Sequence, residues 1–268
     1  MAQMTLAIIG GGNLGTAIAL GAAKEKVAPA KNITVTRRQP EKLAALKKQG
    51  FQTTSDNLTA VKNSRIIILC VQPKQLAGLL QSINPVLKKG KHILVSTITG
   101  ISTEEIASHI TPGVPIVRAM PNTAIAIGAS MTCLCSRDTT ESQLQEIEKL
   151  FQALGLTLRI EERLMKAATV LAASGIAFFM RYLRAATQGG IQMGFDAEEA
   201  QLIATQTARG AASLLLNQHS HPEIEIDKVT TPEGCTIAGL NEMEHQGLSS
   251  ALIKGIIASY EKISRIKN

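Results

Sequence analysis

Short apolar runs rich in β-branched residues recur along the first 160 residues, and segments with helical spacing lie between them. The runs are continuously apolar, which is typical of strands buried on both faces of a parallel sheet. This alternation predicts an α/β fold with an N-terminal Rossmann-type doubly wound sheet. The predicted strands are Leu6–Ile9, Ile33–Thr36, Ile66–Val71, Ile93–Thr97, Ile116–Arg118 and Ser130–Leu134. The predicted helices include 14–24, 41–49, 73–84, 103–110 and 140–154.

The pattern changes near residue 162, where strand-like runs give way to long Ala-rich segments with helical spacing. We therefore expect two domains, an α/β domain at 1–160 and an all-α C-terminal domain at 161–268. Because the helical part is apolar on more than one face, it predicts a homodimer or a larger assembly of dimers, with a monomeric bundle as the alternative. The predicted helices span 163–188, 196–218 and 237–266, with Gly189, Gly190 and Gly194 between the first two.

The composition is that of a globular protein, with 45% hydrophobic and 18% charged residues. No uninterrupted apolar run of about 18 residues and no basic leader are seen, so we expect no membrane span and a cytoplasmic protein. The cysteines form no CxxC pair and no His cluster accompanies them, so no metal site is expected. They are Cys70, Cys133, Cys135 and Cys235.

The net charge of +7 is concentrated at the start of the chain, where residues 1–100 carry 14 Lys and Arg against 3 Asp and Glu. A basic field of this kind attracts a polyanion, either nucleic acid or a phosphorylated dinucleotide. The chain lacks aromatic residues interleaved with the basic ones and any nucleic-acid-binding motif, so we expect no nucleic-acid partner.

A glycine-rich loop follows the first predicted strand directly and precedes a helix-patterned segment. The spacing is G-x-G-x-x-G, which in this setting predicts a dinucleotide site with the pyrophosphate at the helix N-terminus. The first glycine permits the turn, the second lets the pyrophosphate approach the backbone, and the third lets the helix pack on the strand. The loop consists of Gly10, Gly11, Gly12, Asn13, Leu14 and Gly15.

Two arginines stand where a site for NAD would carry an acidic residue. Arg37 and Arg38 follow the second predicted strand, about 20 residues beyond the loop, and no Asp or Glu accompanies them. Guanidinium groups suit the 2′-phosphate of NADP, and Asn57 could add a hydrogen bond to it. We therefore expect NADP, with NADPH preferred over NADH; two surface arginines are the alternative interpretation.

The segment 227–240, which reads DKVTTPEGCTIAGL, resembles the signature of pyrroline-5-carboxylate reductases. Other matches occur in family order over nearly the whole chain. They are the glycine loop, Val71-Gln72-Pro73, RAMPNT at 118–123, Glu161-Glu162 and Ser174-Gly175. The resemblance implies an oxidoreductase that reduces 1-pyrroline-5-carboxylate to L-proline with NADPH, the last step of proline biosynthesis.

The resemblance also implies where the rest of the cofactor lies. Residues 97–99 align with the loop under the nicotinamide, at the end of a predicted strand where ligands of open parallel sheets bind. Asn122 follows another strand and either orients a ring or serves a turn. The additional cofactor residues so implied are Val71, Gln72, Pro73, Thr97, Ile98, Thr99 and Asn122.

In the family, the 227–240 segment forms a loop over the substrate carboxylate. The backbone amides of Cys235 and Thr236 are implied to bind that carboxylate, and the Thr236 hydroxyl to bond the ring nitrogen, which makes Thr236 the candidate catalytic residue. Helix capping is the alternative role for the threonines, and an exposed helix-start carboxylate is the alternative for Glu162. The implied substrate-binding residues are Glu162, Ser174, Thr231, Gly234, Cys235 and Thr236.

Glu233, Gln72 and Ile176 depart from the family pattern, and a Glu beside a carboxylate site repels the substrate unless it points to solvent. Two other functions stay open at this point. One is a β-hydroxyacid or imine reductase of the same architecture, whose hydroxyacid members use a Lys or a His in the helical domain, with Lys166 as the candidate lysine. The other is a non-catalytic sensor, which would bind NADPH without turnover.

Overall fold

The computed structural model describes residues 4–264, which divide into two compact units. The first contains the chain up to Ser174 together with the stretch that begins at Tyr260, and the second is Gly175–Ser259. The functional boundary expected between residues 160 and 161 stays a prediction.

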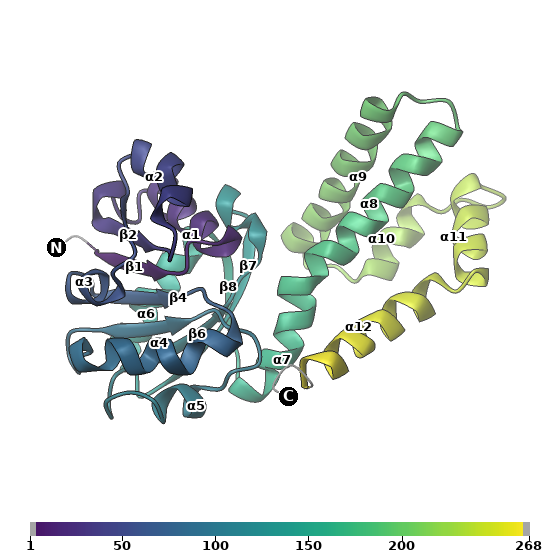
Figure 1. The fold of residues 1–268 in the computed structure, drawn as a ribbon. Coiled ribbons are helices and arrows are strands. Elements are labelled where there is room, and N and C mark those ends of the chain that lie inside the picture. The colour runs from purple at the N-terminus through teal and green to yellow at the C-terminus, as the bar shows by residue number, and fades with distance from the viewer. Residues whose placement is uncertain (1–3, 265–268) are drawn as a thin grey trace. The chain divides into compact units, whose positions relative to one another are not determined.

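The first unit is built on an eight-stranded sheet of order β3-β2-β1-β4-β5-β6-β7-β8 (Figure 1). All neighbouring strands are parallel except β6 and β7, which are antiparallel. The order reverses between β1 and β4, and crevices at such reversals are where open α/β sheets bind ligands. The strands are β1 Leu6–Ile9, β2 Ile33–Thr36, β3 Gln52–Thr54, β4 Ile66–Leu69, β5 Ile93–Ser96, β6 Ile116–Met120, β7 Ser130–Arg137 and β8 Gly155–Arg159.

Helices cover both faces of this sheet, as the continuous apolar strands predicted. Successive residues of one strand point to opposite faces, so Leu6 and Ile8 pack in one core while Ala7 and Ile9 pack in the other. The first core includes α1 and α6, and the second includes α3, α4 and α5. The helices of this unit are α1 Asn13–Lys24, α2 Ala44–Lys48, α3 Asn57–Lys62, α4 Leu76–Ile83, α5 Thr103–Ala107, α6 Glu141–Gln152 and α7 Met165–Ala168.

A six-residue π-helix, Thr169–Ser174, follows α7 and ends where the second unit begins. The second unit is entirely helical, which confirms the all-α expectation for the C-terminal part. Its helices are α8 Gly175–Gln192, α9 Ala197–Gln218, α10 Pro222–Val229, α11 Cys235–His245 and α12 Leu248–Ser264, the last of which runs back into the first unit.

Several predicted bounds were wrong. Gly189 and Gly190 lie inside α8 and do not separate two helices; a Cβ on Gly190 would stand 2.8 Å from the Cβ of Ala200, so this glycine lets α8 and α9 approach closely. The helix predicted over 237–266 is two helices, broken at Gly247, which has a positive φ of 82°. Strands β3 and β8 were not predicted.

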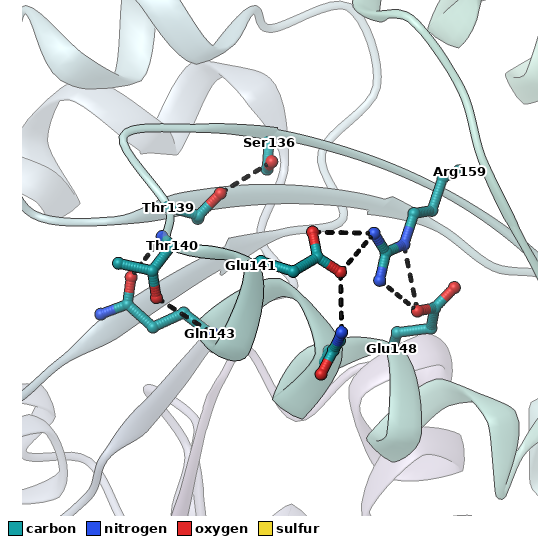
Figure 2. A network of polar contacts seen from close by, with 8 residues as sticks. Ser136, Thr139, Thr140, Glu141, Gln143, Glu148 and Arg159 are labelled. Carbon is teal, nitrogen blue, oxygen red and sulfur yellow. Dashed lines mark hydrogen bonds and ion pairs between the residues drawn. The ribbon is translucent and has the colours of Figure 1, made fainter.

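The edge strand β8 is held to α6 by a polar network (Figure 2). Arg159 on β8 donates to Glu141 at 2.8 Å and to Glu148 at 2.7 Å, two carboxylates that lie two turns apart on α6. The helix begins with a capping box, in which Gln143 N donates to Thr140 Oγ1 and Thr140 N donates to Gln143 Oε1. The network therefore fixes both the start of α6 and the strand beside it.

One helical stretch of the described chain, Glu162–Gln192, is long and apolar enough to cross a membrane by length and composition. Exposed Arg181 and Arg184 interrupt it, and only 28% of its most apolar window is buried in the structure. Large apolar side chains are exposed in the second unit, both within this stretch and beyond it. They include Phe179, Met180, Met193, Leu202, Leu216 and Ile253.

Candidate active site

The glycine loop turns tightly at the carboxyl end of β1. Gly10 has a φ of 109°, which L side chains rarely adopt, and a Cβ there would stand 2.3 Å from the carbonyl oxygen of Cys70. A Cβ on Gly15 would stand 2.2 Å from the carbonyl oxygen of Gly10. Both positions therefore require glycine, one for the turn and the other for the close packing of α1 on the strand.

Gly12 differs from these two, because no atom lies within 4 Å of the position that its Cβ would take. It is the N-cap of α1, and no side chain caps the helix or places a carboxylate in its first turn. An uncapped helix start with open space before it is a site for an anion. The loop thus fits the pyrophosphate of a dinucleotide.

Arg37 and Asn57 lie beside this loop at the end of β2. Arg37 Nη1 donates to the carbonyl oxygen of Gly11 at 2.8 Å, while Arg38 is exposed. Thr36 Oγ1 donates to Asn57 Oδ1 at 2.6 Å, which leaves the amide nitrogen of Asn57 as the end available to an acceptor. The two guanidinium groups and this amide offer donors, as binding of a 2′-phosphate requires.

The ends of β4 and β5 complete the same edge of the sheet. A Cβ on Gly10 would stand 3.1 Å from Val71 Cγ1, so the segment after β4 lies against the glycine turn. Thr97 Oγ1 donates to the carbonyl oxygen of Leu69 at 2.9 Å, which pins the segment after β5 to the end of β4. Ile98 is buried and Thr99 is half-buried.

Gln72 and Pro73 form the short connection from β4 to α4. Gln72 N donates to Gln75 Oε1 at 3.1 Å, and Pro73 opens a 3₁₀ turn. This contact stabilises the turn, and Gln72 itself is exposed at the same edge as the glycine loop.

Asn122 follows β6, and its side chain bonds the protein backbone at both ends. Its Oδ1 accepts from Ala124 N at 3.0 Å, and its Nδ2 donates to the carbonyl oxygen of Ala172 at 3.1 Å. The first bond stabilises the turn after β6, which is one of the two roles considered for Asn122 from the sequence. The second ties the end of β6 to the π-helix that ends at Ser174. A cofactor role for Asn122 stays a prediction.

Glu162 lies where the chain enters α7, and three hydrogen bonds reach its carboxylate. Thr103 donates twice, from its backbone N at 2.7 Å and its Oγ1 at 2.6 Å, and Arg118 Nη1 donates at 3.0 Å. Burial opposes ionisation, but the bonds from Thr103 and Arg118 outweigh it and hold the pKa of Glu162 below its ordinary value. The sequence missed this grouping, because Thr103 and Arg118 are distant from Glu162 along the chain.

In the second unit, residues 231–234 make the turn expected before α11. Gly234 N donates to the carbonyl oxygen of Thr231 at 3.0 Å, and a Cβ on Gly234 would stand 2.5 Å from Thr231 Oγ1. Glu233 adopts a positive φ of 59°, a conformation that glycine tolerates better, and its side chain is exposed to solvent.

Gly234 is the N-cap of α11, so neither Thr231 nor Thr236 caps this helix. Cys235 and Thr236 occupy its first turn, in which no acidic residue lies. The helix start therefore presents free backbone donors beside a threonine hydroxyl, as the carboxylate site implied by the resemblance requires.

The cysteines are free thiols, and three of them stay protonated at neutral pH. Burial raises the pKa of the Cys70 thiol to about 12 and that of Cys135 to about 11, and also raises that of Cys133. Cys235 is exposed at the start of α11. Among residues 4–264, no three His, Cys, Asp or Glu side chains form a group that could hold a metal ion.

A glycine turn at the switch point of a doubly wound sheet, with an uncapped helix after it, is the arrangement of a dinucleotide-binding domain, which is typical of dinucleotide-dependent oxidoreductases. Comparison with known proteins is in agreement. A family model described as NADP oxidoreductase, coenzyme F420-dependent, matches residues 5–100, and one described as pyrroline-5-carboxylate reductase dimerisation matches residues 162–266.

Two curated relatives come from Dictyostelium discoideum. Pyrroline-5-carboxylate reductase 2 is 48% identical over 97% of this chain and 92% of its own length. Pyrroline-5-carboxylate reductase 1 is 47% identical over 97% of this chain, which spans only 49% of that longer protein. The chain belongs to the pyrroline-5-carboxylate reductase family.

A crystal structure of pyrroline carboxylate reductase from Plasmodium falciparum with NADP bound has the same fold. The TM-score is 0.91 over 100% of both chains, at 22% sequence identity.

Proposed function

We propose that this member of the family is an NADPH-preferring pyrroline-5-carboxylate reductase that works as a cytoplasmic homodimer, or as a larger assembly of dimers. As a family member it reduces 1-pyrroline-5-carboxylate to proline with NAD(P)H, a hydride addition to a C=N bond. The observation that carries the cofactor preference is at the end of β2, where Arg37 and Arg38 stand and no carboxylate does. We assign binding of the cofactor to residues 1–160 and binding of the substrate and dimerisation to residues 161–268.

The cofactor supplies the hydride, and the protein contributes binding and orientation. The first turn of α1 and the loop before it would hold the pyrophosphate, and Arg37, Arg38 and Asn57 the 2′-phosphate. The segment 97–99 would lie beneath the nicotinamide. These assignments are supported by the common edge at which all of these residues lie.

On the substrate side, the backbone amides of Cys235 and Thr236 would bind the carboxylate at the start of α11. The Thr236 hydroxyl would accept the N–H of the protonated ring nitrogen and keep the C=N bond polarised while the carbon receives hydride. The exposed side chain of Glu233 can point away from that carboxylate, so its charge does not prevent substrate binding.

Homodimer formation is supported by the match of residues 162–266 to a dimerisation model and by the apolar side chains exposed in the second unit. We propose that these side chains meet a second copy and not lipid, because Arg181 and Arg184 lie in the stretch that could cross a membrane. No contact with nucleic acid is part of this proposal.

The test is the oxidation of NADPH, followed by absorbance, on addition of 1-pyrroline-5-carboxylate. Rapid oxidation with formation of proline is expected. A non-catalytic sensor would bind NADPH and leave it unoxidised.

Lys166 distinguishes the hydroxyacid reductase alternative. Its Nζ lies 3.7 Å from the centre of the Tyr260 ring, a cation–π contact that joins α7 to α12. We therefore expect Lys166→Ala to keep its turnover of 1-pyrroline-5-carboxylate. Loss of turnover in a stably folded variant would favour the hydroxyacid type of chemistry.

A further inference from the structure

Glu162, Arg118 and Thr103 form a connection between three elements that are distant in sequence. Arg118 lies in the middle of β6, Thr103 begins α5, and Glu162 begins the stretch that leads through α7 to the π-helix. The four hydrogen-bonding groups involved are a guanidinium, a backbone N–H, a hydroxyl and the carboxylate that they share. All three residues belong to the first unit.

The cluster is costly to maintain, which argues that it does more than stabilise the fold. Arg118 is only 6% exposed, and its Nε has no hydrogen-bond partner among the described residues. Thr103 is 2% exposed. A buried guanidinium with an unpaired N–H destabilises a protein relative to an apolar residue of similar size. Its compensation here is the carboxylate of Glu162.

Thr103 also ends the segment that follows β5. The segment begins at Thr97. Thr97 donates two hydrogen bonds to the carbonyl oxygen of Leu69, from its Oγ1 at 2.9 Å and from its backbone N at 3.1 Å. Between its ends the backbone turns at Gly100, which has a φ of 80°. The carboxylate of Glu162 thus holds one end of the segment 97–103, and the end of β4 holds the other.

We propose that Glu162, oriented by Arg118, is a positioning residue that fixes the segment 97–103 beneath the nicotinamide and does not contact the substrate. This rests on the function proposed above and replaces the substrate-binding role that the resemblance suggested for Glu162. Three donors already occupy three of the roughly four acceptor positions of this carboxylate, two on Oε1 and one on Oε2, and both oxygens are committed to Thr103. Arg118 and Thr103 then contribute to function indirectly, Arg118 by orienting Glu162 and Thr103 by being held by it.

The experiment compares Glu162→Gln, Thr103→Val and Thr103→Ser in the full-length protein. Glu162→Gln keeps the shape and loses the charge, Thr103→Val loses only the hydroxyl, and Thr103→Ser restores it. The matched control is Glu161→Gln, since Glu161 is a neighbouring carboxylate whose only ion pair among the described residues, to Arg163, is exposed. The measurements are hydride transfer in single turnovers, its deuterium isotope effect, NADPH affinity and the Michaelis constant of the substrate.

A misplaced nicotinamide slows the chemical step more than it weakens binding. We expect hydride transfer to slow by about tenfold or more in Glu162→Gln and Thr103→Val, with a larger isotope effect on turnover and binding constants within about threefold of wild type. Thr103→Ser should recover most of the rate, and Glu161→Gln should match wild type. A double variant, Glu162→Gln with Thr103→Val, should be no slower than the slower of the two single variants, because both changes break the same connection.

Two results would overturn the proposal. An increase in the substrate Michaelis constant with unchanged hydride transfer in Glu162→Gln would make Glu162 a substrate ligand. A lower melting temperature with unchanged hydride transfer and isotope effect would make the cluster merely structural. Failure of the proposed function itself would appear separately, as a wild-type protein that does not oxidise NADPH with this substrate.

Discussion

Gly12 contributes to the site by having no side chain. Because a Cβ there would meet no atom within 4 Å, Gly12→Val should leave the melting temperature nearly unchanged while its methyl groups occupy the pyrophosphate position. We expect NADPH binding to be lost in a titration followed by fluorescence. Gly78→Val, at another glycine with open space, is the control for adding a branched side chain. Wild-type affinity in a folded Gly12→Val would contradict the assignment of the loop.

Arg37 and Arg38 are expected to discriminate between the two cofactors. Their joint replacement by Ala should raise the Michaelis constant for NADPH by more than about tenfold, because a charge-assisted bond contributes roughly 1.5–3 kcal/mol. The constant for NADH should change little. Lys31→Ala, at the opposite end of β2, controls for the loss of positive charge. Equal losses for both cofactors would show that the bond from Arg37 to Gly11 matters and the 2′-phosphate does not.

Thr236 is expected to be the most important residue on the substrate side. If its hydroxyl bonds the ring nitrogen more tightly as hydride is added, Thr236→Ala should lower turnover by about tenfold to a hundredfold and affect substrate affinity less. Thr236→Val should behave like Ala, and Thr236→Ser should recover much of the rate. Thr230→Val controls for loss of a hydroxyl, because Thr230 Oγ1 donates to the carbonyl oxygen of Ile226 in the same region. Wild-type kinetics in Thr236→Val would mean that the substrate site lies elsewhere.

Some candidate residues can be identified from sequence spacing alone, and others only from the folded structure. The glycine loop and the arginines could be predicted because each role depends on spacing within one βαβ unit. The Thr103, Arg118 and Glu162 cluster could not, since neither pattern nor spacing indicates which buried arginine will meet which carboxylate. A buried Arg inside an apolar strand was the available signal, because such a charge requires a partner.

Among the elements, Arg159 gives a prediction for stability. Hydrogen bonds from Arg159 and Gln145 lower the pKa of Glu141 below its ordinary value, so the contact stabilises the protein above the pKa of the unfolded chain and is lost as the pH falls through the lower folded value. Arg159→Met should therefore lower the melting temperature at pH 7, and the difference from wild type should shrink in acid. Thermal unfolding of both proteins at pH 7 and in acid, each at two salt concentrations, measures this effect.

Arg137→Met is the matched control at the end of β7. Arg137 Nε lies 3.6 Å from Asp138 Oδ2, and both side chains are exposed. Its melting temperature should stay near that of wild type. An equal loss in both variants, or a loss in Arg159→Met that persists in acid, would show that the network does not act through the Glu141 charge.

The elements that the sequence predicted best are the central strands. Their β-branched runs are buried on both faces, and for β1 and β2 the predicted bounds match the structure. Strand β3 is short and polar, and β8 exposes Leu156 and Leu158 at the edge of the sheet, so neither had the pattern of a buried strand. The antiparallel pairing of β7 depends on the turn after β6, where the chain reverses at Gly128 with a φ of 72°. Hydrophobic periodicity contains no information on strand direction.

At the scale of the whole molecule, the apolar surface of the helical unit predicts association. We expect a dimer or a multiple of it in light scattering, and we expect Phe179→Glu with Leu202→Glu, at side chains 71% and 70% exposed, to dissociate it and lower activity. Leu156→Glu on β8 is the control and should leave the assembly intact. A fully active wild-type monomer would contradict the prediction.

The open space at Gly12 has a consequence for inheritance. On the loop assignment and the dimer proposed above, a chain with a side chain at this position would lose the cofactor, remain folded and keep the helices that form the dimer, so the cell would not remove it as misfolded. In a cell that makes both versions, many normal chains would then be paired with inactive ones. Where activity requires both members of a pair, one altered gene copy would reduce flux by more than half, which is the genetic behaviour called dominant-negative.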